Sequence, residues 1–332
     1  MSWVIGVESL TRAFPEGCVV AIGVFDGVHR GHQALIQKAV QHARAQGLPA
    51  VALTFDPHPL QVLSPAHAPP LLCSLRHRLE RLRGFGIDLT VVQPFTEAFA
   101  RLSAGDFVET VLVQGLGARV VVVGEDFQFG AGRSGDVAFL RQDGRFEVLA
   151  IAPVVDEKGE RLSSTRVRQW VQSGVLDCVH QALGEPFHWE GVVMRGDQRG
   201  RTLGYPTANL APVVNQVCPA PGVYACRATV AGEPYPAAVS VGTPPMFPNA
   251  RAIVEAYLIG FPDQPLYGRL LTLEFLAKLR EQGAFESLEA LQQQMAQDVA
   301  RTEAIYRDFF APAPSQNSRN PLDGGEPLGV HS

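Results

Sequence analysis

The first half of this 332-residue chain alternates short, continuous aliphatic runs with helical patterns. Runs such as 19–25 and 118–124 hold almost no polar residue, which is typical of strands buried on both faces of a parallel sheet. The pattern from His32 to Gln46 places apolar side chains on one helical face and ends at Gly47. We therefore predict a doubly wound, Rossmann-like α/β domain, in which ligands bind at the carboxyl ends of the strands. The predicted strands are 19–25, 50–55, 89–92, 118–124 and 146–154, with further helices over 104–114, 164–173 and 175–183.

The second half has a different pattern, which begins at Pro186. From Trp189 to Leu276, short strand-like runs are broken by Gly, Pro and Asn, and this predicts a small antiparallel β-barrel. An amphipathic pattern over 288–299 predicts a terminal helix that packs on the barrel. We therefore divide the chain into a first domain over 1–184, a barrel domain with its helix over 185–310, and a disordered tail over 311–332 that is rich in Pro and polar residues.

Composition limits the kinds of partner. The net charge of −5 comes without any basic tract, so we expect no nucleic-acid partner. The chain shows no signal peptide and no apolar stretch of membrane-spanning length, so we expect no membrane partner. Its five cysteines form no C-x-x-C pair, which fits free thiols in a reducing cytoplasm better than disulfides or structural zinc. Small molecules are the expected partners, and the chain is expected to be a monomer or a weak homo-oligomer.

The motif GVFDGVHRGH joins the first predicted strand to the helix that follows it. Gly27 and Gly31 allow the backbone to approach a ligand closely, and a helix N-terminus favours an anion. His29 and His32 lie three residues apart at this end, where two imidazole donors suit a phosphate whose charge grows during reaction. A metal-binding pair or two surface histidines are the alternative interpretations. The order of strand, glycines and helix favours a phosphate site.

Three further motifs follow predicted strands of the first domain. TFDPHP places His58 between two prolines, and VGEDFQFGAGRSG places Asp126 at a strand end before a glycine-rich loop. RLSSTRVR opens a helix with Arg166 and Arg168, which are unfavourable near a helix start unless an anion is close. The alternatives are a rigid turn for His58, a turn-forming carboxylate for Asp126, and ordinary helix caps for the serines.

The barrel carries its own candidate site, in the stretch EGVVMRGDQRGRTLGYPTANL. Its glycines and arginines are compatible with a phosphate cradle or with a plain hairpin. Thr207 and Asn209 lie two residues apart and so share one side of a strand, and their oxygens are hard ligands suited to Mg²⁺. Glu255, in IVEAYL, is either a base for an attacking hydroxyl or a solvent-facing strand residue.

These motifs carry a resemblance to a known family. HRGH matches the H-x-G-H signature of adenylyltransferases, and SSTRVR looks like their second phosphate-binding signature. The full set, with PTAN and PGVYA in the second half, resembles bacterial bifunctional riboflavin kinase/FAD synthetase. The resemblance implies that the barrel phosphorylates riboflavin to FMN, and that the first domain transfers AMP from ATP to FMN. ATP is then the co-substrate, FAD and pyrophosphate are products, and Mg²⁺ is the metal.

The motifs and the resemblance together predict the site residues. The catalytic group is His29, His32 and Glu255. ATP and its phosphates are assigned to Gly23, Phe25, Asp26, Gly31, Ser164, Thr165 and Arg168, and flavin or nucleotide to His58, Asp126 and Phe127. In the barrel, the nucleotide is assigned to Gly196, Gly200 and Arg201, and Mg²⁺ to Thr207 and Asn209.

Three positions depart from the family pattern. Met246 stands where the family has Thr, Tyr257 where it has His, and Tyr205 where it often has Phe. A single-activity riboflavin kinase and a flavin-binding regulator derived from the enzyme are therefore alternatives, although the regulator would be expected to have lost residues such as His29 and Glu255. An adenylyltransferase for another nucleotide is a further alternative, but it would not require a PTAN barrel.

Overall fold

A six-stranded, all-parallel sheet forms the centre of the first domain, with the strand order β1-β4-β3-β2-β5-β6. The computed structural model describes residues 3–10, 14–195, 204–242, 253–262 and 264–311. The strands of the sheet are β1 (Trp3–Ile5), β2 (Cys18–Ile22), β3 (Ala50–Asp56), β4 (Leu89–Pro94), β5 (Ala118–Gly124) and β6 (Glu147–Ile151).

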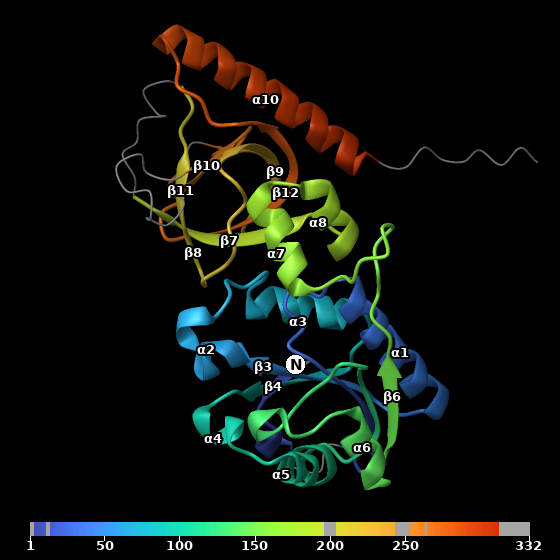
Figure 1. Ribbon diagram of the computed structural model, residues 1–332. Coiled ribbons are helices and arrows are strands. Elements are labelled where there is room, and N and C mark those ends of the chain that lie inside the picture. Colours follow the sequence, from blue (N-terminus) through green and yellow to red (C-terminus); the bar gives the residue numbers. More distant parts are fainter. Residues whose placement is uncertain (1–2, 11–13, 196–203, 243–252, 263, 312–332) are drawn as a thin grey trace, which may run out of the picture.

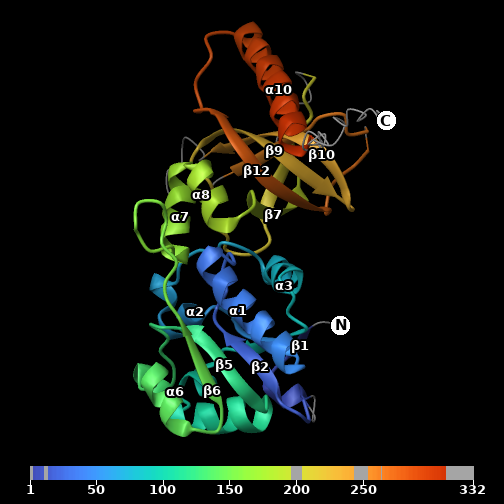
Figure 2. The ribbon, with the colours of Figure 1, turned by 90° about the vertical axis from the view of Figure 1, so that its right-hand side faces the viewer.

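Helices cover both faces of this sheet (Figures 1 and 2). Ile36 and Leu82 pack on one face, against side chains such as Val19 and Val120, while Val111 and Leu140 pack on the other. The predicted doubly wound architecture is confirmed. The helices are α1 (Arg30–Gln46), α2 (Pro59–Leu63), α3 (Leu75–Gly84), α4 (Glu97–Ala100), α5 (Ala104–Asp106), the π-helix η3 (Phe107–Gly115), α6 (Val137–Asp143) and the short 3₁₀ turns η1 (Val7–Ser9), η2 (Pro65–His67) and η4 (Ala131–Arg133).

The sheet differs from the prediction in its details. Edge strand β1 pairs with β4 and was not expected, since it is only three residues long. The strand predicted over 19–25 ends at Ile22, because the chain then leaves the sheet in a tight turn. The helix predicted over 104–114 is one turn of α-helix followed by a π-helix.

The second domain is a closed barrel with the strand order β10-β11-β8-β7-β12-β9, as predicted (Figure 1). All its strand pairs are antiparallel. The strands are β7 (Phe187–Met194), β8 (Ala208–Pro212), β9 (Gly222–Val230), β10 (Glu233–Gly242), β11 (Ile253–Leu258) and β12 (Leu270–Arg280).

The terminal helix α10 (Leu288–Phe310) begins at the N-cap Ser287, whose hydroxyl accepts from the amide of Ala290. It contacts β9, β10 and β12, and Asp298 forms an ion pair with Arg280 of β12 at 2.8 Å. Of the face expected to pack on the barrel, Leu291, Met295 and Val299 are partly buried, but Leu288 is 55% exposed. The predicted helix is confirmed, and its contact begins one turn later than expected. Residues 312–332, predicted to be a disordered tail, lie outside the described residues.

Two helices lie between the sheet and the barrel: α7 (Ser164–Ser173) and α8 (Leu176–Leu183) (Figures 1 and 2). Their apolar side chains, including Val171 and Val179, belong to the same apolar cluster as the barrel interior. No helix of the described chain is long and apolar enough to cross a membrane. All five cysteine thiols are free, and burial raises the pKa of the Cys18 and Cys73 thiols to about 12.

Candidate active sites

The turn after β2 is tightly folded and brings the first motif to the carboxyl edge of the sheet. Phe25 and Val28 take φ values of 53° and 41°, and Gly27 takes 78°, a region that favours glycine. A Cβ atom on Gly27 would lie 2.8 Å from the side chain of Leu72. A Cβ atom on Gly23 would lie 3.0 Å from the buried ring of Phe25. The glycines of the motif therefore allow close packing of the turn itself.

His29 and His32 stack on each other at the start of α1. Their ring centroids are 3.8 Å apart with an angle of 19° between the planes, and His29 is the N-cap residue of the helix. Phe25 supports His32 edge-to-face at 5.4 Å. A Cβ atom on Gly31 would lie 3.1 Å from the His29 ring, which explains the glycine of the H-x-G-H pattern. The Nδ1 atoms of both rings are buried and have no hydrogen-bond partner in the described structure.

Both imidazoles are neutral at pH 7. Burial, followed by the charges of Arg161 and Arg168, lowers the pKa of His29 to about 4. Burial, the neighbouring His29 and the charge of Arg78 hold the pKa of His32 well below its ordinary value. A neutral imidazole still has one N–H donor, and surrounding positive charge favours an anion. The pair is therefore suited to hydrogen bonding with a phosphate.

Asp26 faces the protein interior and ties the first motif to α7. Its side chain accepts hydrogen bonds from the amides of Leu72 at 2.9 Å and Cys73 at 3.3 Å, and forms an ion pair with Arg168 at 2.5 Å. The Ser164 hydroxyl donates to the Asp26 carbonyl at 3.0 Å. The structure thus brings two predicted phosphate-binding residues of α7 onto the motif. The sequence predicted an anion near Arg168, and the structure shows that the Asp26 carboxylate is one such anion.

The other predicted residues at the start of α7 have different surroundings. Arg166 pairs with Asp156 at 2.9 Å and Glu160 at 2.6 Å, and its guanidinium lies 4.6 Å from the centre of the Trp170 ring. Thr165 is exposed. Two carboxylates of the preceding hairpin therefore balance the positive charge of Arg166, which the sequence could not distinguish from a phosphate contact.

The predicted flavin-binding residues follow β3 and β5. His58 caps α2, where its Nδ1 accepts from the Leu60 amide at 3.2 Å, so its Nε2 carries the proton. Burial lowers the pKa of His58, and Asp26 and Arg168 both act on it electrostatically. Asp126 pairs with Arg161 at 2.6 Å on the surface. Phe127 stacks on Phe129, with ring centroids 5.5 Å apart.

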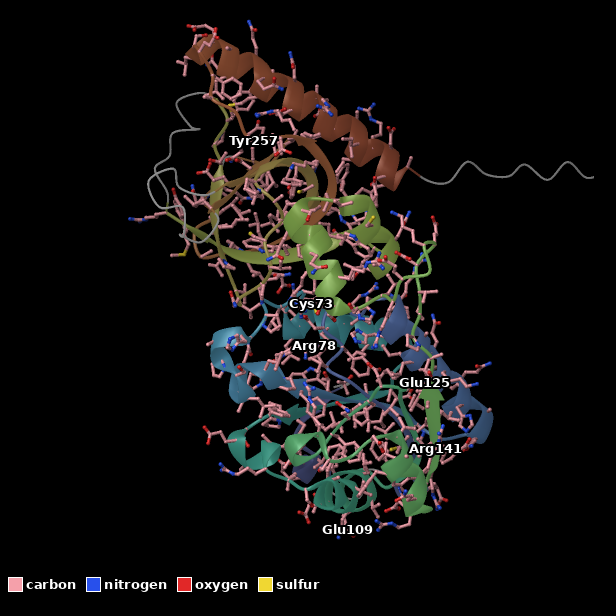
Figure 3. All side chains as sticks on the ribbon, viewed as in Figure 1. Cys73, Arg78, Glu109, Glu125, Arg141 and Tyr257 are labelled. Atoms are coloured by element: carbon pink, nitrogen blue, oxygen red, sulfur yellow. The ribbon has the colours of Figure 1, made fainter. Side chains whose placement is uncertain are left out.

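Arg78 of α3 is a candidate site residue that the sequence reasoning missed. It is fully buried, and its Nη1 donates to the Phe55 carbonyl at 2.9 Å and the Thr54 hydroxyl at 3.3 Å. Its Nε and Nη2 have no hydrogen-bond partner, and no carboxylate pairs with it within the described ranges. Figure 3 shows it with Cys73 on the side of the first domain that faces α7. Arg78 is one of four arginines in α3, so the sequence gives no signal that this one is buried.

The barrel groups its candidate residues on adjacent strands. In β8, Ala208 and Leu210 are buried while Asn209 is partly exposed, and Thr207, also partly exposed, lies just before the strand. Asn209 is in direct register with Glu255 of β11. Two positions that depart from the family pattern, Tyr205 and Tyr257, contact each other edge-to-face at 5.3 Å. The remaining predicted residues, Gly196, Gly200 and Arg201, and the departure at Met246, lie outside the described residues.

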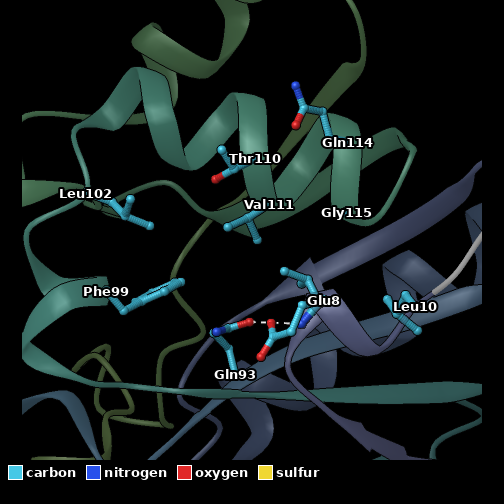
Figure 4. Close-up of a pocket in the computed structure, with 10 residues that line it drawn as sticks. Glu8, Leu10, Gln93, Phe99, Leu102, Thr110, Val111, Gln114 and Gly115 are labelled. Atoms are coloured by element: carbon cyan, nitrogen blue, oxygen red, sulfur yellow. Dashed lines mark hydrogen bonds between the residues drawn. The ribbon is translucent and has the colours of Figure 1, made fainter.

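A pocket of about 440 Å³ lies elsewhere in the first domain, between η1, β4 and η3 (Figure 4). Its lining includes Gln93, Phe99 and Thr110. The Gln93 side-chain oxygen accepts from the Val7 amide at 3.1 Å, and so holds η1 against β4. The pocket contains none of the predicted site residues.

The fold and the two groups of residues define a class of protein. A candidate phosphate site at the strand ends of one domain, joined to a barrel with candidate oxygen ligands for a metal, fits a two-domain nucleotide-dependent transferase. A family model for FAD synthetase matches residues 11–166, and one for riboflavin kinase matches residues 183–306. The chain belongs to the bifunctional riboflavin kinase/FMN adenylyltransferases.

Individual relatives cover nearly the whole chain. The bifunctional riboflavin kinase/FMN adenylyltransferase of Escherichia coli K12 is 38% identical over 93% of this chain and 98% of its own length. That of Pseudomonas fluorescens is 37% identical over 92% of this chain and 98% of its own length. A crystal structure of a Streptococcus pneumoniae protein, named as a macrolide-efflux protein, has a TM-score of 0.81 at 31% identity, with 91% of this chain and 99% of that one covered. The prediction of an enzyme with both flavin activities is confirmed.

Proposed function

We propose that adenylyl transfer takes place at the His29–His32 pair and riboflavin phosphorylation at Glu255. The observation that supports the first assignment most strongly is the pair of buried, unpartnered Nδ1 atoms. A buried polar atom without a hydrogen bond costs about 1–3 kcal/mol, and phosphate oxygens would supply the missing partners. Arg161 and Arg168 add positive charge around the His29 ring, and Arg78 adds it around the His32 ring.

In the first domain, an oxygen of the FMN phosphate attacks the α-phosphorus of ATP. The bond from that phosphorus to the bridging oxygen breaks, and pyrophosphate leaves. The FMN phosphate is already ionised at pH 7, so no base is required, and positioning with charge stabilisation carries the catalysis. His29 and His32 donate to the α-phosphate as its charge grows, and Ser164, Thr165 and Arg168 hold the departing phosphates.

Further residues of the first domain are proposed to bind ATP and the flavin nucleotide. Gly23, Phe25, Asp26 and Gly31 shape the ATP-binding turn, in which Asp26 acts from inside through its bond to Arg168. His58, with its proton on Nε2, and the Asp126–Phe127 loop form the side proposed for the flavin nucleotide.

In the barrel, Glu255 takes the proton from the 5′-hydroxyl of riboflavin while the oxygen attacks the γ-phosphorus of ATP and ADP leaves. Thr207 and Asn209 would hold Mg²⁺, and a donor set of hydroxyl and amide oxygens beside a carboxylate fits this hard cation. When bound, the ion neutralises charge on the ATP phosphates. Gly196, Gly200 and Arg201 are proposed to hold the nucleotide.

The test separates the two reactions by their products. Purified protein is incubated with ATP and Mg²⁺ and either riboflavin or FMN, and flavins are followed by chromatography. His29→Ala should stop FAD formation while FMN accumulates, and Glu255→Ala should block FMN formation while FAD is still made from added FMN. The exposed residues His67 and Glu233 supply matched alanine controls. Loss of both reactions in either folded variant contradicts this division of labour.

The setting of the enzyme is also a proposal. Five free thiols, three of them with a pKa raised to about 12 by burial, fit a reducing cytoplasm. We expect a monomer or a weak homo-oligomer without nucleic-acid or membrane partners, and light scattering of the purified protein measures its mass in solution.

A further inference from the structure

The segment from Pro70 to Cys73 lies between the two domains and touches both of them. On the barrel side, the Leu71 amide donates to the Asn215 carbonyl at 2.7 Å, and the Val217 amide donates to the Leu71 carbonyl at 2.8 Å. These bonds form a parallel bridge between residue 71 and residue 216. The Leu72 side chain belongs to the apolar cluster of the barrel. The segment is therefore attached to the second domain through backbone and side chain.

The same segment binds the first motif on its other side. The amides of Leu72 and Cys73 donate to the Asp26 carboxylate. Arg168, the ion-pair partner of Asp26, also donates from Nε to the Pro70 carbonyl at 2.7 Å. Asp26 is three residues before His29 in the chain. Displacement of the segment would therefore move Asp26, and with it the turn that leads to His29.

Gln216 fixes this segment from the barrel. The residue is 7% exposed, and its side-chain Nε2 donates to the Leu72 carbonyl at 3.0 Å and to the His188 carbonyl at 2.6 Å. Its Oε1 accepts from the Glu190 amide at 3.3 Å. Leu72 thus presents its carbonyl to Gln216 and its amide to Asp26. Leu72 is therefore hydrogen-bonded on one side to a side chain of the barrel domain and on the other to the carboxylate of the first motif.

We propose that Gln216 of the barrel is a positioning residue for adenylyl transfer in the other domain. It orients Leu72, whose amide orients Asp26, and so it keeps His29 in its place at the start of α1. A barrel residue is then part of the support of the adenylyltransferase site, although it touches neither substrate nor the histidines. The inference rests on the proposed assignment of adenylyl transfer to His29 and His32.

The experiment uses the full chain and the isosteric variant Gln216→Met, which keeps the volume and removes all three hydrogen bonds. FAD formation from added FMN and FMN formation from riboflavin are measured separately. We expect kcat for FAD formation to fall about tenfold, the rate equivalent of one lost buried hydrogen bond. The kinase reaction should change less than about twofold, because none of the three lost hydrogen bonds reaches a residue assigned to the kinase site. Gln293→Ala, at an exposed glutamine of α10, is the matched control.

A double-mutant cycle with Asp26→Ala, which removes the carboxylate that the Leu72 amide binds, tests the route of the effect. If Gln216 acts through Asp26, Gln216→Met adds little to the loss of kcat that Asp26→Ala alone has caused. Additive losses, an unchanged rate of FAD formation, or an equal loss of both reactions would overturn the inference. His29→Ala measured in parallel keeps the two proposals apart. Normal FAD formation by that variant overturns the site assignment, whereas its inactivity beside a fully active Gln216→Met variant overturns only the role of Gln216.

Discussion

Asp26→Asn is the substitution that tests most directly how the two halves of the first active site are held together. Asp26 is 1% exposed and Arg168 is 7% exposed, and their side chains lie 2.5 Å apart. Asparagine has nearly the same shape and keeps one oxygen that can accept from the Leu72 amide. The substitution therefore removes the charge and leaves the Arg168 guanidinium buried without its counter-ion.

The size of the effect follows from this burial. Removal of one partner of a buried ion pair costs about 3–5 kcal/mol, because the remaining charge stays desolvated. In a domain of this size, each kcal/mol of lost unfolding free energy lowers the melting temperature by about 2–4 °C. The first domain should therefore melt about 6–20 °C lower. FAD formation should fall as well, since Asp26 holds the turn before His29.

Differential scanning calorimetry of the full chain measures the shift, and a second substitution tests its cause. In Asp26→Asn/Arg168→Met both charges of this buried pair are gone, so most of the lost stability should return. Glu97→Gln, in an exposed pair with Arg101, should shift the transition by less than the equivalent of about 1 kcal/mol. The argument is refuted if Asp26→Asn melts like the unmodified protein, or if the double variant is less stable than the single one.

Three further predictions concern the two sites. Because the pKa of His29 is lowered to about 4 in the folded state, its contribution to stability is complete above about pH 6.5 and is lost as the pH falls to about 4. The loss amounts to about 3 kcal/mol of the free energy of unfolding. Chemical denaturation across this range should show that this free energy depends less on pH in His29→Gln than in the unmodified protein. An identical dependence would contradict the lowered pKa of His29. Gly31→Ala should displace the His29 ring and lower FAD formation about tenfold or more, whereas Gly84→Ala, with open space around its Cβ, should have no effect. Asn209→Ala should raise the Mg²⁺ concentration needed for half-maximal FMN formation, and an unchanged requirement would remove Asn209 from the metal site.

The fold could be predicted where burial leaves a simple pattern. Strands such as β2 and β5 are covered on both faces, so they appear in the sequence as unbroken aliphatic runs. Edge strand β1 has three residues of alternating exposure and gives no comparable run. Helix α3 escaped notice because Arg78 occupies one of its two buried positions, which interrupts the apolar period. The π-helical hydrogen bonds of η3 leave no signature in the sequence either.

The site could be predicted where its residues are close in the chain. The spacing of His29 and His32 at a helix start is enough to place their rings together. The support around them is not local: Leu72 is 46 residues from Asp26, and Gln216 is 144 residues from Leu72. No periodic pattern connects such distant positions. The charge argument for Arg168 correctly required a nearby anion, but the sequence could not show that Asp26 supplies one.

Helix α7 has a consequence for how the two activities can be inherited. Arg168 on this helix pairs with Asp26, while Val167 and Val171 lie in the apolar cluster of the barrel. An exchange of either domain for a foreign one would have to preserve two unrelated sets of contacts on three turns of a single helix. The two domains are therefore poorly suited to being exchanged independently by recombination. Selection on one activity also constrains the sequence that serves the other.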